Sequence, residues 1–452
     1  MKEENRHQKA PFVPARETIM GVRPRTKLEI HASSLNTLQK VPHDSFLTSK
    51  YTNQSHQSSS TPKLTTHQYI DNNTQLSPQP IYTFCFPSHL NGMYRYTKDL
   101  LALDACRPDP TDPRPPQELR PIITPLNPVA WAQELVHMPD KQLVSYLLTG
   151  IQFGFRVGYN RHLSKLVSAK TNMQSALLNR QPVQEFLTKE SLAGRLLGPF
   201  NPHLMPSIHT SRFGVIPKRS QPGKWRLILD LSSPDGHSVN DGISSDICSM
   251  SYASVDHAAQ IISQLGQDAL MAKIDIAHAY RNVPVHPEDR YLLGMQWDCS
   301  IYIDSVLPFG LRSAPKIFSS LSDTLEWIFR HNQVQHILHY LDDFFTAGTP
   351  DTDQCKQHLD TIISICQKLG FPLATDKIEG PSTLLVFLGI LLDSHLKQMR
   401  LPEQKLQELK AMVAQWLEKK TSTKKRPFIA NWPLSLCLKS RSRRKTLPQE
   451  ND

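Results

Sequence analysis

The sequence lacks long apolar runs, an apolar leader and closely spaced cysteines. No run of about 18 apolar residues occurs, so we expect no membrane span. The N-terminal residues are charged and no apolar segment follows them, so we expect no secretory signal. The seven cysteines are scattered and none forms a C-x-x-C pair, which argues against a disulfide framework and a zinc knuckle. These absences predict an intracellular protein, of the cytoplasm or the nucleus.

The positive charge is unevenly distributed along the chain. The 452 residues have a formal net charge of +10. Residues 421–452 hold eight Lys and Arg against two acidic residues, so this tail contributes +6 of that charge. The rest of the chain is only mildly basic, and its charge is weak evidence for nucleic-acid binding. Function has to be inferred from particular residues.

The first part of the chain differs in composition from the rest. Residues 1–115 are polar and rich in proline, with little periodicity, and we predict that they are disordered. Residues 116–195 show helical spacing of apolar residues and predict a helical N-terminal extension. Within this extension, a helical pattern from Leu166 to Leu187 is expected to break at Pro182.

Residues 196–395 alternate short apolar runs with helical patterns and turn residues. They predict an α+β domain built around an antiparallel sheet that is backed by helices. The expected elements are a hairpin at 215–229, a helix at 256–265, a strand at 270–276, a helix at 314–329, a hairpin at 337–347, a helix through 359–369 and a strand pair at 384–392. Beyond this domain, residues 396–420 predict an amphipathic helix and residues 421–452 a basic, unstructured tail.

Two adjacent aspartates interrupt an otherwise apolar segment. Asp342 and Asp343 lie in the run from Ile337 to Phe345, which has the composition of a strand. Neighbouring carboxylates in apolar surroundings repel each other and lose hydration, and a hard divalent cation is the usual compensation. A third carboxylate, Asp275, follows another apolar strand. Because two metal ions need ligands from more than one strand, the three aspartates predict a two-metal phosphoryl-transfer site.

Several short motifs follow one another between residues 213 and 392. Residues 273–280 read KIDIAHAY, residues 307–318 read LPFGLRSAPKIF and residues 340–343 read YLDD. In this order they resemble the first catalytic motif, the template- and nucleotide-positioning motif and the metal-binding hairpin of retroelement reverse transcriptases.

Further segments extend this resemblance. Residues 224–230 resemble the fingers, and residues 369–377 and 386–390 resemble the two motifs that follow the hairpin, the second being the primer grip. Residues 283–287 are similar to gypsy-type elements. Residues 230–241 and the helical lead-in are most similar to tyrosine-recombinase (DIRS-like) retrotransposons.

The resemblance implies a role for each of the three aspartates. Asp275 and Asp342 would hold two Mg²⁺ ions, or Mn²⁺ in their place, and Asp343 would support the site more peripherally. Lys377 would protonate the leaving pyrophosphate. Without the resemblance, Lys377 is interpreted equally well as a surface lysine.

The resemblance also implies a site for the incoming nucleotide. Arg226, together with Lys218 and Lys224, would hold the triphosphate, because a guanidinium binds phosphate through two hydrogen bonds. Tyr280 would lie under the sugar and exclude a 2′-hydroxyl, which favours deoxynucleotides. The alternatives are a solvated hairpin for Lys224 and Arg226 and a core aromatic for Tyr280.

Two loops complete the implied site. Phe309 and Gly310 would lie at the nascent base pair, where a glycine permits close approach of the backbone; the alternative for Gly310 is a turn glycine. Phe387, Leu388 and Gly389 would form the primer grip.

The sequence thus implies a right-hand fingers–palm polymerase with an antiparallel palm sheet. Its expected activity is RNA-directed DNA synthesis, with an RNA or DNA template–primer and deoxynucleoside triphosphates as partners. The alternative is a catalytically decayed or domesticated nucleic-acid-binding remnant. About 60 residues follow the primer grip, so we expect an incomplete thumb and no RNase H domain.

The basic tail has two interpretations. Read one nucleotide later with suitable codons, residues 421–452 permit an apolar, helical string, and we hypothesise that this tail is out of frame. The alternative is a nuclear-localisation or nucleic-acid-binding tail.

Overall fold

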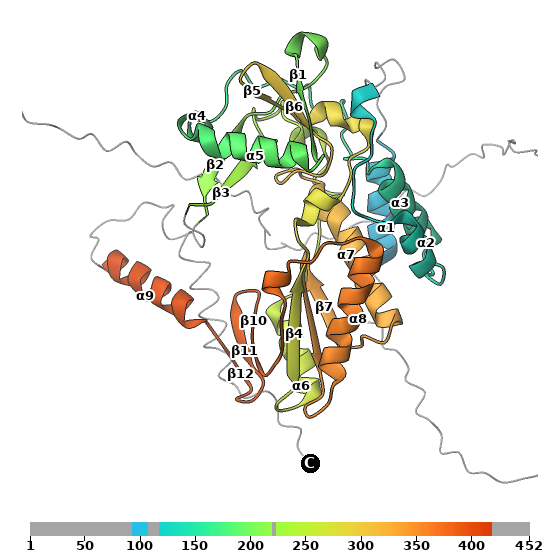
Figure 1. Cartoon of the computed structure of the whole chain (residues 1–452), viewed down its shortest axis with the longest axis vertical. Coiled ribbons are helices and arrows are strands. Elements are labelled where there is room, and N and C mark those ends of the chain that lie inside the picture. Colours follow the sequence, from blue (N-terminus) through green and yellow to red (C-terminus); the bar gives the residue numbers. More distant parts are fainter. Residues whose placement is uncertain (1–92, 107–116, 219–222, 418–452) are drawn as a thin grey trace, which may run out of the picture. The chain divides into compact units, whose positions relative to one another are not determined.

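The computed structural model describes residues 93–106, 117–218 and 223–417 (Figure 1). Most of the segment predicted to be disordered, and all of the basic tail at 421–452, lie outside these residues. None of the helices in the described ranges is long and apolar enough to cross a membrane.

Helix α1 (Met93–Asp104) lies inside the region that we predicted to be disordered, so this part of the prediction was wrong. Leu100 and Leu103 are fully buried in the core. Asp99 forms an ion pair with the buried Lys316, with 3.2 Å between its Oδ2 and Nζ. Because a 12-residue helix is marginal in water without tertiary packing, its stability depends on a partner more than 200 residues away, which local composition does not show.

Four helices follow in the N-terminal extension: α2 (Pro128–Glu134), α3 (Lys141–Phe153), α4 (Gln174–Leu178) and α5 (Arg180–Leu192). The helix expected from residue 166 is absent before α4, where the chain is irregular. Pro182 does not break a helix either. It lies in the first turn of α5, where a backbone N–H has no partner within the helix and proline is tolerated.

The central sheet is antiparallel, with strand order β7-β8-β4-β9. The strands are β4 (Leu270–Asp275), β7 (Ile337–Tyr340), β8 (Asp343–Gly348) and β9 (Glu379–Ser382). Together with the helices, this sheet confirms the predicted α+β class. The hairpin expected at 337–347 corresponds to β7 and β8.

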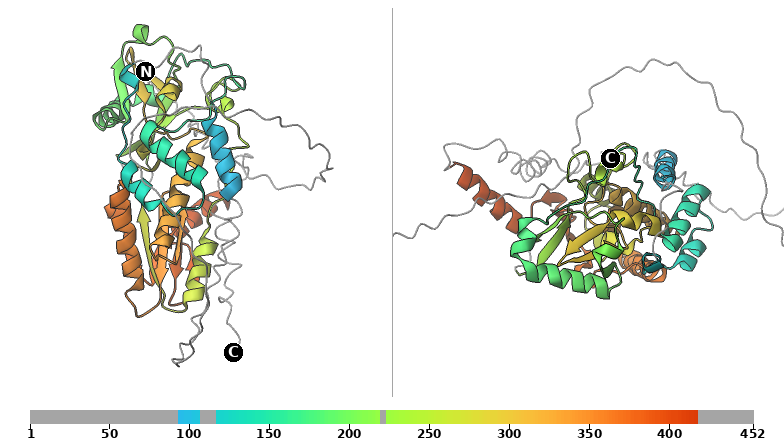
Figure 2. Two further views of the ribbon diagram at one scale, coloured as in Figure 1. Left: turned by 90° about the vertical axis from the view of Figure 1, so that its right-hand side faces the viewer. Right: turned by 90° about the horizontal axis from the view of Figure 1, so that it is seen from above.

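Helices cover both faces of this sheet. On one face, α7 (Ala314–His331) and α8 (Gln354–Leu369) pack against β7 and β8. On the other face lie α6 (Val255–Leu265) and the hairpin of β10 (Leu384–Phe387) and β11 (Ile390–Asp393). In the left view of Figure 2 the sheet is seen between α8, in orange, and α6, in yellow-green. Alternate residues of each strand therefore enter two different apolar clusters.

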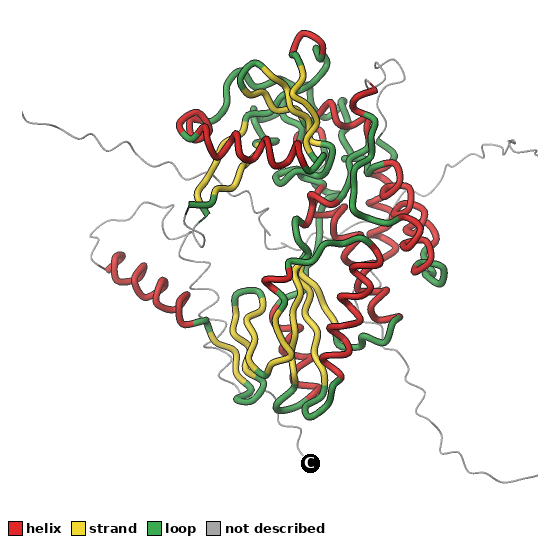
Figure 3. The backbone as a smooth tube through the Cα atoms, in the orientation of Figure 1, coloured by secondary structure: helices red, strands yellow, loops and turns green. Residues whose placement is uncertain are grey.

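Three smaller sheets complete the strands that the structure describes (Figure 3). Strands β2 (Phe213–Pro217) and β3 (Trp225–Leu229) form the expected hairpin. The order β1-β6-β5 joins β1 (Leu196–Phe200), β6 (Ser300–Asp304) and β5 (Gly294–Trp297), and β12 (Gln398–Arg400) extends the β10–β11 hairpin. The strands β1, β5, β6, β9 and β12 were not predicted from the sequence. Helix α9 (Glu403–Leu417) follows, as expected.

Short 3-10 helices connect these elements: η2 (Gln117–Leu119), η3 (Pro202–Leu204), η4 (Asn240–Gly242), η5 (Ala279–Asn282), η6 (Pro287–Leu292) and η7 (Thr375–Lys377). Two of them matter for the site described below, because η5 follows β4 and η7 precedes β9.

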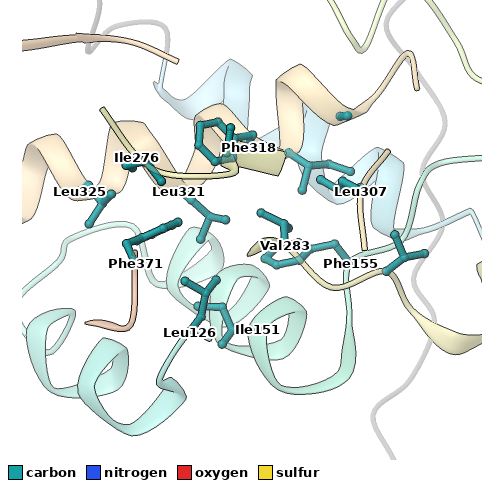
Figure 4. Close-up of a cluster of buried hydrophobic side chains, with 14 of the residues drawn as sticks. Leu126, Ile151, Phe155, Ile276, Val283, Leu307, Phe318, Leu321, Leu325 and Phe371 are labelled. Atoms are coloured by element: carbon teal, nitrogen blue, oxygen red, sulfur yellow. The ribbon is translucent and has the colours of Figure 1, made fainter. Parts of the chain in front are cut away.

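The helical extension shares one apolar core with the sheet domain. Leu126 and Ile151 of the extension belong to the same buried cluster as Phe371, which follows α8 (Figure 4). Trp131 is fully buried, and its Nε1 donates a hydrogen bond to the Leu369 carbonyl at 3.2 Å. The extension therefore folds as part of the domain that carries the three aspartates.

Candidate active site

The sheet register brings the three predicted carboxylates to one end of β4 and β8. Asp275 is the last residue of β4 and Asp343 the first of β8, and the two are direct cross-strand partners. Asp342 lies in the two-residue turn between β7 and β8, after Leu341, whose φ is 56°. The Ile276 N–H donates to the Asp342 carbonyl at 3.0 Å and fixes this turn beside β4.

The carboxylates disturb one another electrostatically. Burial raises the pKa of Asp342, and the charge of Asp275 raises it further. Burial, together with the charges of Asp342 and Asp275, raises the pKa of Asp343 to about 7. A cation is therefore favoured at this end of the sheet, because it would relieve the repulsion between the carboxylates.

One cationic side chain already lies at this end. Lys377, in η7, places its Nζ 2.8 Å from Oδ2 of Asp275. Within the described ranges, no three His, Cys, Asp or Glu side chains are grouped closely enough to enclose one metal ion as they stand. The oxygen donors suit Mg²⁺ or Mn²⁺ in their chemistry. Asp275 would exchange its lysine partner for the ion.

A buried histidine, His339, links the hairpin that carries Asp342 and Asp343 to helix α7. His339 places its Nδ1 2.7 Å from Glu326 and its Nε2 3.2 Å from Asp323, and its ring stacks on Phe344 with centroids 5.2 Å apart. Burial alone would lower the pKa of His339, but its hydrogen bonds to the two carboxylates and their charges raise it to about 9. No pattern in the sequence distinguishes His339 as more than a neighbour of the aspartates.

Tyr280 lies in η5, five residues after Asp275, and its ring contacts two other aromatic rings. The centroids of Phe309 and Phe318 are each 5.2 Å from that of Tyr280. Phe309 is 51% exposed, whereas Phe318 is fully buried. Burial is also the main reason that the pKa of Tyr280 is raised. The structure thus joins the predicted residues Tyr280 and Phe309 in one aromatic group with an exposed edge.

Gly310 occupies a position that excludes other residues. Its φ is +96°, and a Cβ there would lie 2.8 Å from the Leu229 carbonyl oxygen. The side chain of Asn240 holds this loop, because its Nδ2 donates to the Gly310 carbonyl at 2.8 Å and its Oδ1 accepts from the Arg312 N–H at 2.7 Å. Asn240 lies within residues 230–241, but this role was not predicted from the sequence.

The predicted triphosphate ligands form a basic group around the β2–β3 hairpin. Burial lowers the pKa of Lys218, and the positive charges of Arg226, Lys224, Lys189 and Lys377 lower it further. Lys218 follows β2, and its N–H donates to the Lys224 carbonyl at 2.8 Å. Lys189, in α5, was not predicted. Apart from burial, only neighbouring positive charges lower the pKa of Lys218. Such a concentration of positive charge can attract a polyanion.

The three residues predicted as a primer grip lie at the tip of the β10–β11 hairpin. Leu388 and Gly389 form its turn, with φ of 47° and 78°. Phe387 is 1% exposed and packs on Phe345 with ring centroids 5.2 Å apart. Its side chain therefore holds the hairpin on the sheet and does not line a surface, which corrects its assignment as a contact residue. The turn itself is only half-buried.

A buried ion network lies next to Tyr280 along the chain. Arg281 contacts Glu190 at 3.0 Å and Asp304 at 2.7 Å, and Arg195 contacts Glu190 at 2.8 Å. Burial raises the pKa of Glu190, but Arg195 and Arg281 outweigh burial and lower it to about 2. For Asp304 burial dominates, and its pKa rises to about 6 despite Arg281. This network joins α5 and β6 to η5.

Comparison with known families identifies this region of the chain. Residues 216–392 match the family of reverse transcriptases (RNA-dependent DNA polymerases). The chain therefore carries a reverse transcriptase domain of the retroelement and retrovirus type, and the three aspartates lie inside it.

The particular relatives are viral and transposon polyproteins. The chain is 25% identical over 171 residues to polyprotein P3 of Commelina yellow mottle virus, 22% over 176 residues to the Pro-Pol polyprotein of feline foamy virus, and 23% over 190 residues to the Pol polyprotein of transposon 412 of Drosophila melanogaster. These alignments include 38%, 39% and 41% of this chain but only 8%, 14% and 14% of the relatives. The chain thus spans a small part of the length of the relatives it matches.

Solved structures of a foamy viral protease-reverse transcriptase are also similar. The complex with dsDNA matches with a TM-score of 0.46 at 15% identity, over 70% of this chain and 63% of that chain. The complex with RNA/DNA hybrid matches with a TM-score of 0.46 at 14% identity, over 72% and 42%.

Proposed function

We propose that this chain is the RNA-directed DNA polymerase of a retrotransposon, which adds nucleotides to a primer 3′-hydroxyl along a template strand. One observation carries this proposal. Inside a reverse transcriptase domain, Asp275, Asp342 and Asp343 meet at one end of two paired strands, where their repulsion favours a divalent cation.

In this proposal Asp275 and Asp342 hold two Mg²⁺ ions, or Mn²⁺, and Asp343 supports them from the start of β8. When bound, the metal would lower the pKa of the primer 3′-hydroxyl and neutralise the triphosphate. Lys377 would leave Asp275 as the site loads. It would then be free to donate a proton to the leaving pyrophosphate.

The basic group receives the triphosphate. Arg226, Lys218 and Lys224 lie on one hairpin and already repel one another, so a polyanion would relieve their unfavourable interaction. Tyr280 would lie against the deoxyribose and leave no room for a 2′-hydroxyl. Phe309, as the exposed edge of the aromatic group, would contact the nascent base pair beside Gly310.

The remaining elements then have a place in a right-hand polymerase. The four-stranded sheet would be the palm and the β2–β3 hairpin part of the fingers, with α9 at the start of the thumb. The turn Leu388–Gly389 would hold the primer terminus, and Phe387 would contribute by packing. The partners would be an RNA or DNA template–primer and deoxynucleoside triphosphates.

A primer-extension assay tests the activity. The protein is given poly(rA)/oligo(dT), dTTP and Mg²⁺, beside the variants Asp342→Asn and Asp351→Asn. Asp351 is an exposed aspartate beyond the far end of β8 and serves as the matched control. We expect extension by the wild type and by Asp351→Asn, and its loss in Asp342→Asn. Extension that survives in Asp342→Asn would refute the assignment.

The same assay distinguishes the polymerase from the alternative, a decayed or domesticated nucleic-acid-binding remnant. Absence of extension by the wild type with retained binding of the duplex would favour the remnant. Intact carboxylates at all three positions favour the polymerase.

We also propose that the element is of the tyrosine-recombinase (DIRS-like) type, on the strength of residues 230–241 and of the helical extension before the domain. Sequencing the genomic DNA beside this gene tests the idea. A neighbouring frame for a tyrosine recombinase is expected, and a neighbouring integrase frame of the retroviral kind would contradict it.

A further inference from the structure

Lys273 lies two residues before Asp275 on β4, so the two side chains project from the same face of the sheet. On the neighbouring strand β8, Lys273 is opposite Phe345 and Asp275 is opposite Asp343. This is the face on which the carboxylates are half-buried and on which the β10–β11 hairpin packs. A lysine here lies between the candidate catalytic carboxylates and that hairpin.

The ammonium group of Lys273 joins three strands. Its Nζ donates a hydrogen bond to the carbonyl of Val386, in β10, at 2.9 Å. It also lies 2.8 Å from Oε1 of Glu379, at the start of β9. An ammonium has three N–H donors that can rotate, so both contacts can be made at once. Glu379 is 52% exposed on its side chain and Lys273 only 21%, so the carboxylate holds the ammonium from the solvent side.

The hairpin needs such a contact near its turn. In the described residues β10 belongs to a separate sheet, with β11 and β12, and has no backbone ladder to β4. Phe387 packs on Phe345, but apolar packing is non-directional and fixes the position of the hairpin less specifically than a hydrogen bond does. Ser394, whose Oγ donates to the Ala269 carbonyl at 2.8 Å, fixes only the end remote from the turn.

We propose that Lys273 is a positioning residue that holds the Leu388–Gly389 turn at a fixed distance from Asp275. This inference rests on the proposed function, in which that turn holds the primer terminus. Val386 is two residues before the turn, so the hydrogen bond acts almost at the point where the primer is held. Lys273 touches no substrate. It fixes the hairpin to the same strand that carries a metal ligand, so that hairpin and carboxylate move together.

Three substitutions test this role. Lys273→Met keeps the aliphatic stem and removes both polar contacts. Lys273→Arg keeps a cationic donor and should restore the bond to Val386. Lys356→Met, at an exposed position of α8, is the matched control. Glu379 is exposed enough to be hydrated when it loses its partner, so we expect Lys273→Met to fold. If it does not, Lys273→Gln replaces it.

The activity readout is single-turnover primer extension at several nucleotide concentrations, in which kcat stands for the maximal rate of addition and KM for the nucleotide concentration at half that rate. Because a misplacement of about 1 Å costs roughly 100-fold, we expect kcat of Lys273→Met to fall by about 10- to 100-fold with little change in KM for the nucleotide. Lys273→Arg should recover most of the loss, and Lys356→Met should behave as the wild type. An unchanged kcat in folded Lys273→Met would overturn the inference.

A second readout does not depend on catalysis. A primer with 2-aminopurine at its 3′ end reports by fluorescence how the terminus is held in the complex without nucleotide. Lys273→Met should alter this signal at saturating protein, whereas Lys356→Met should not. Absence of extension by the wild type would contradict the proposed polymerase, and the fluorescence would still decide the role of Lys273. An identical signal in wild type and Lys273→Met would overturn that role.

Discussion

Asp275 and Asp343 face each other across β4 and β8 as direct register partners. Two carboxylates opposite one another on neighbouring strands destabilise a sheet unless one is protonated or a cation lies between them. The pair therefore stores a repulsion that metal binding would release. This relation gives a prediction on stability that does not require polymerase activity.

We expect Asp343→Asn to stabilise the metal-free protein at pH 8 and to weaken the rise in Tm on adding Mg²⁺. The pKa of Asp343 is about 7 in the fold, above that of an ordinary aspartate. Between those two values the folded state binds the additional proton, so this group makes stability fall as the pH rises through that window. Differential scanning fluorimetry in EDTA and in MgCl₂ measures both effects. Asp351→Asn is the control, and an unchanged metal response in Asp343→Asn would contradict the prediction.

His339 gives the same sign of pH dependence in a higher pH window, but as a group that stabilises the fold. Its pKa is about 9 in the fold because Asp323 and Glu326 overcome the effect of burial. A group whose pKa is raised on folding contributes fully below its unfolded pKa and loses that contribution as the pH rises through the folded value. The free energy of unfolding of the wild type should therefore exceed that of His339→Gln at pH 6, and this difference should be smaller near pH 10.

Urea unfolding at several pH values measures this contribution. His203→Gln, at an exposed histidine, is the control and should give a difference that does not change with pH. A difference between wild type and His339→Gln that is the same at pH 6 and pH 10 would show that His339 is not charged in the fold.

Replacing Tyr280 should change the choice of sugar. Tyr280→Val removes the ring from the group with Phe309 and Phe318 and opens space for a 2′-hydroxyl. We expect the preference for dNTP over rNTP to fall by roughly 10- to 100-fold, in the range that a pocket imposes on one added group. Tyr280→Phe keeps the ring and should keep the preference. Primer extension with each nucleotide class measures the ratio, and equal ratios in Tyr280→Val and wild type would refute the role.

The ion pair of Asp99 and Lys316 should contribute to folding. Lys316 is 2% exposed and its ring contact with Tyr96 places Nζ 4.2 Å from the ring centroid, so loss of Asp99 leaves a buried ammonium without its carboxylate. Because Asp99 is partly hydrated, we expect Asp99→Asn to cost about 1 to 3 kcal/mol, below the range for a fully buried pair. Lys98→Gln, exposed on the same helix, should cost under about 0.5 kcal/mol. Equal losses in the two variants would contradict this account.

The sequence predicted elements whose pattern is local and strong. The β2–β3 hairpin, α6, β4, α7, the β7–β8 hairpin and α8 carry clear apolar periodicity, and all were confirmed within a few residues. The meeting of Asp275 with Asp342 and Asp343 could be anticipated because each followed an apolar strand and a two-metal site needs both strands.

Elements that depend on distant partners were not predictable in this way. Strand β1 is short and pairs with β6, about 100 positions further along the chain. The β5–β6 hairpin is local, with Trp297 opposite Ser300, and it was missed because its strands are too short to show a clear pattern. Phe387 belongs to the segment that resembles the primer grip, yet only the structure shows that its side chain is buried against Phe345. The contacts of Lys273 and Arg281 were not predicted either. The sequence shows that these residues are charged, but it does not show that Lys273 binds the Val386 carbonyl or that Arg281 binds Glu190.

Helix α1 has a consequence for the order in which the protein is made. Asp99 leaves the ribosome 217 residues before its partner Lys316. At about 5 to 20 residues per second, this delay is on the order of 10 to 40 s. During that interval Leu100 and Leu103 are synthesised but the core that finally surrounds them is incomplete. The apolar face of α1 is therefore synthesised well before the segment that supplies Lys316, so this helix completes its packing late in translation.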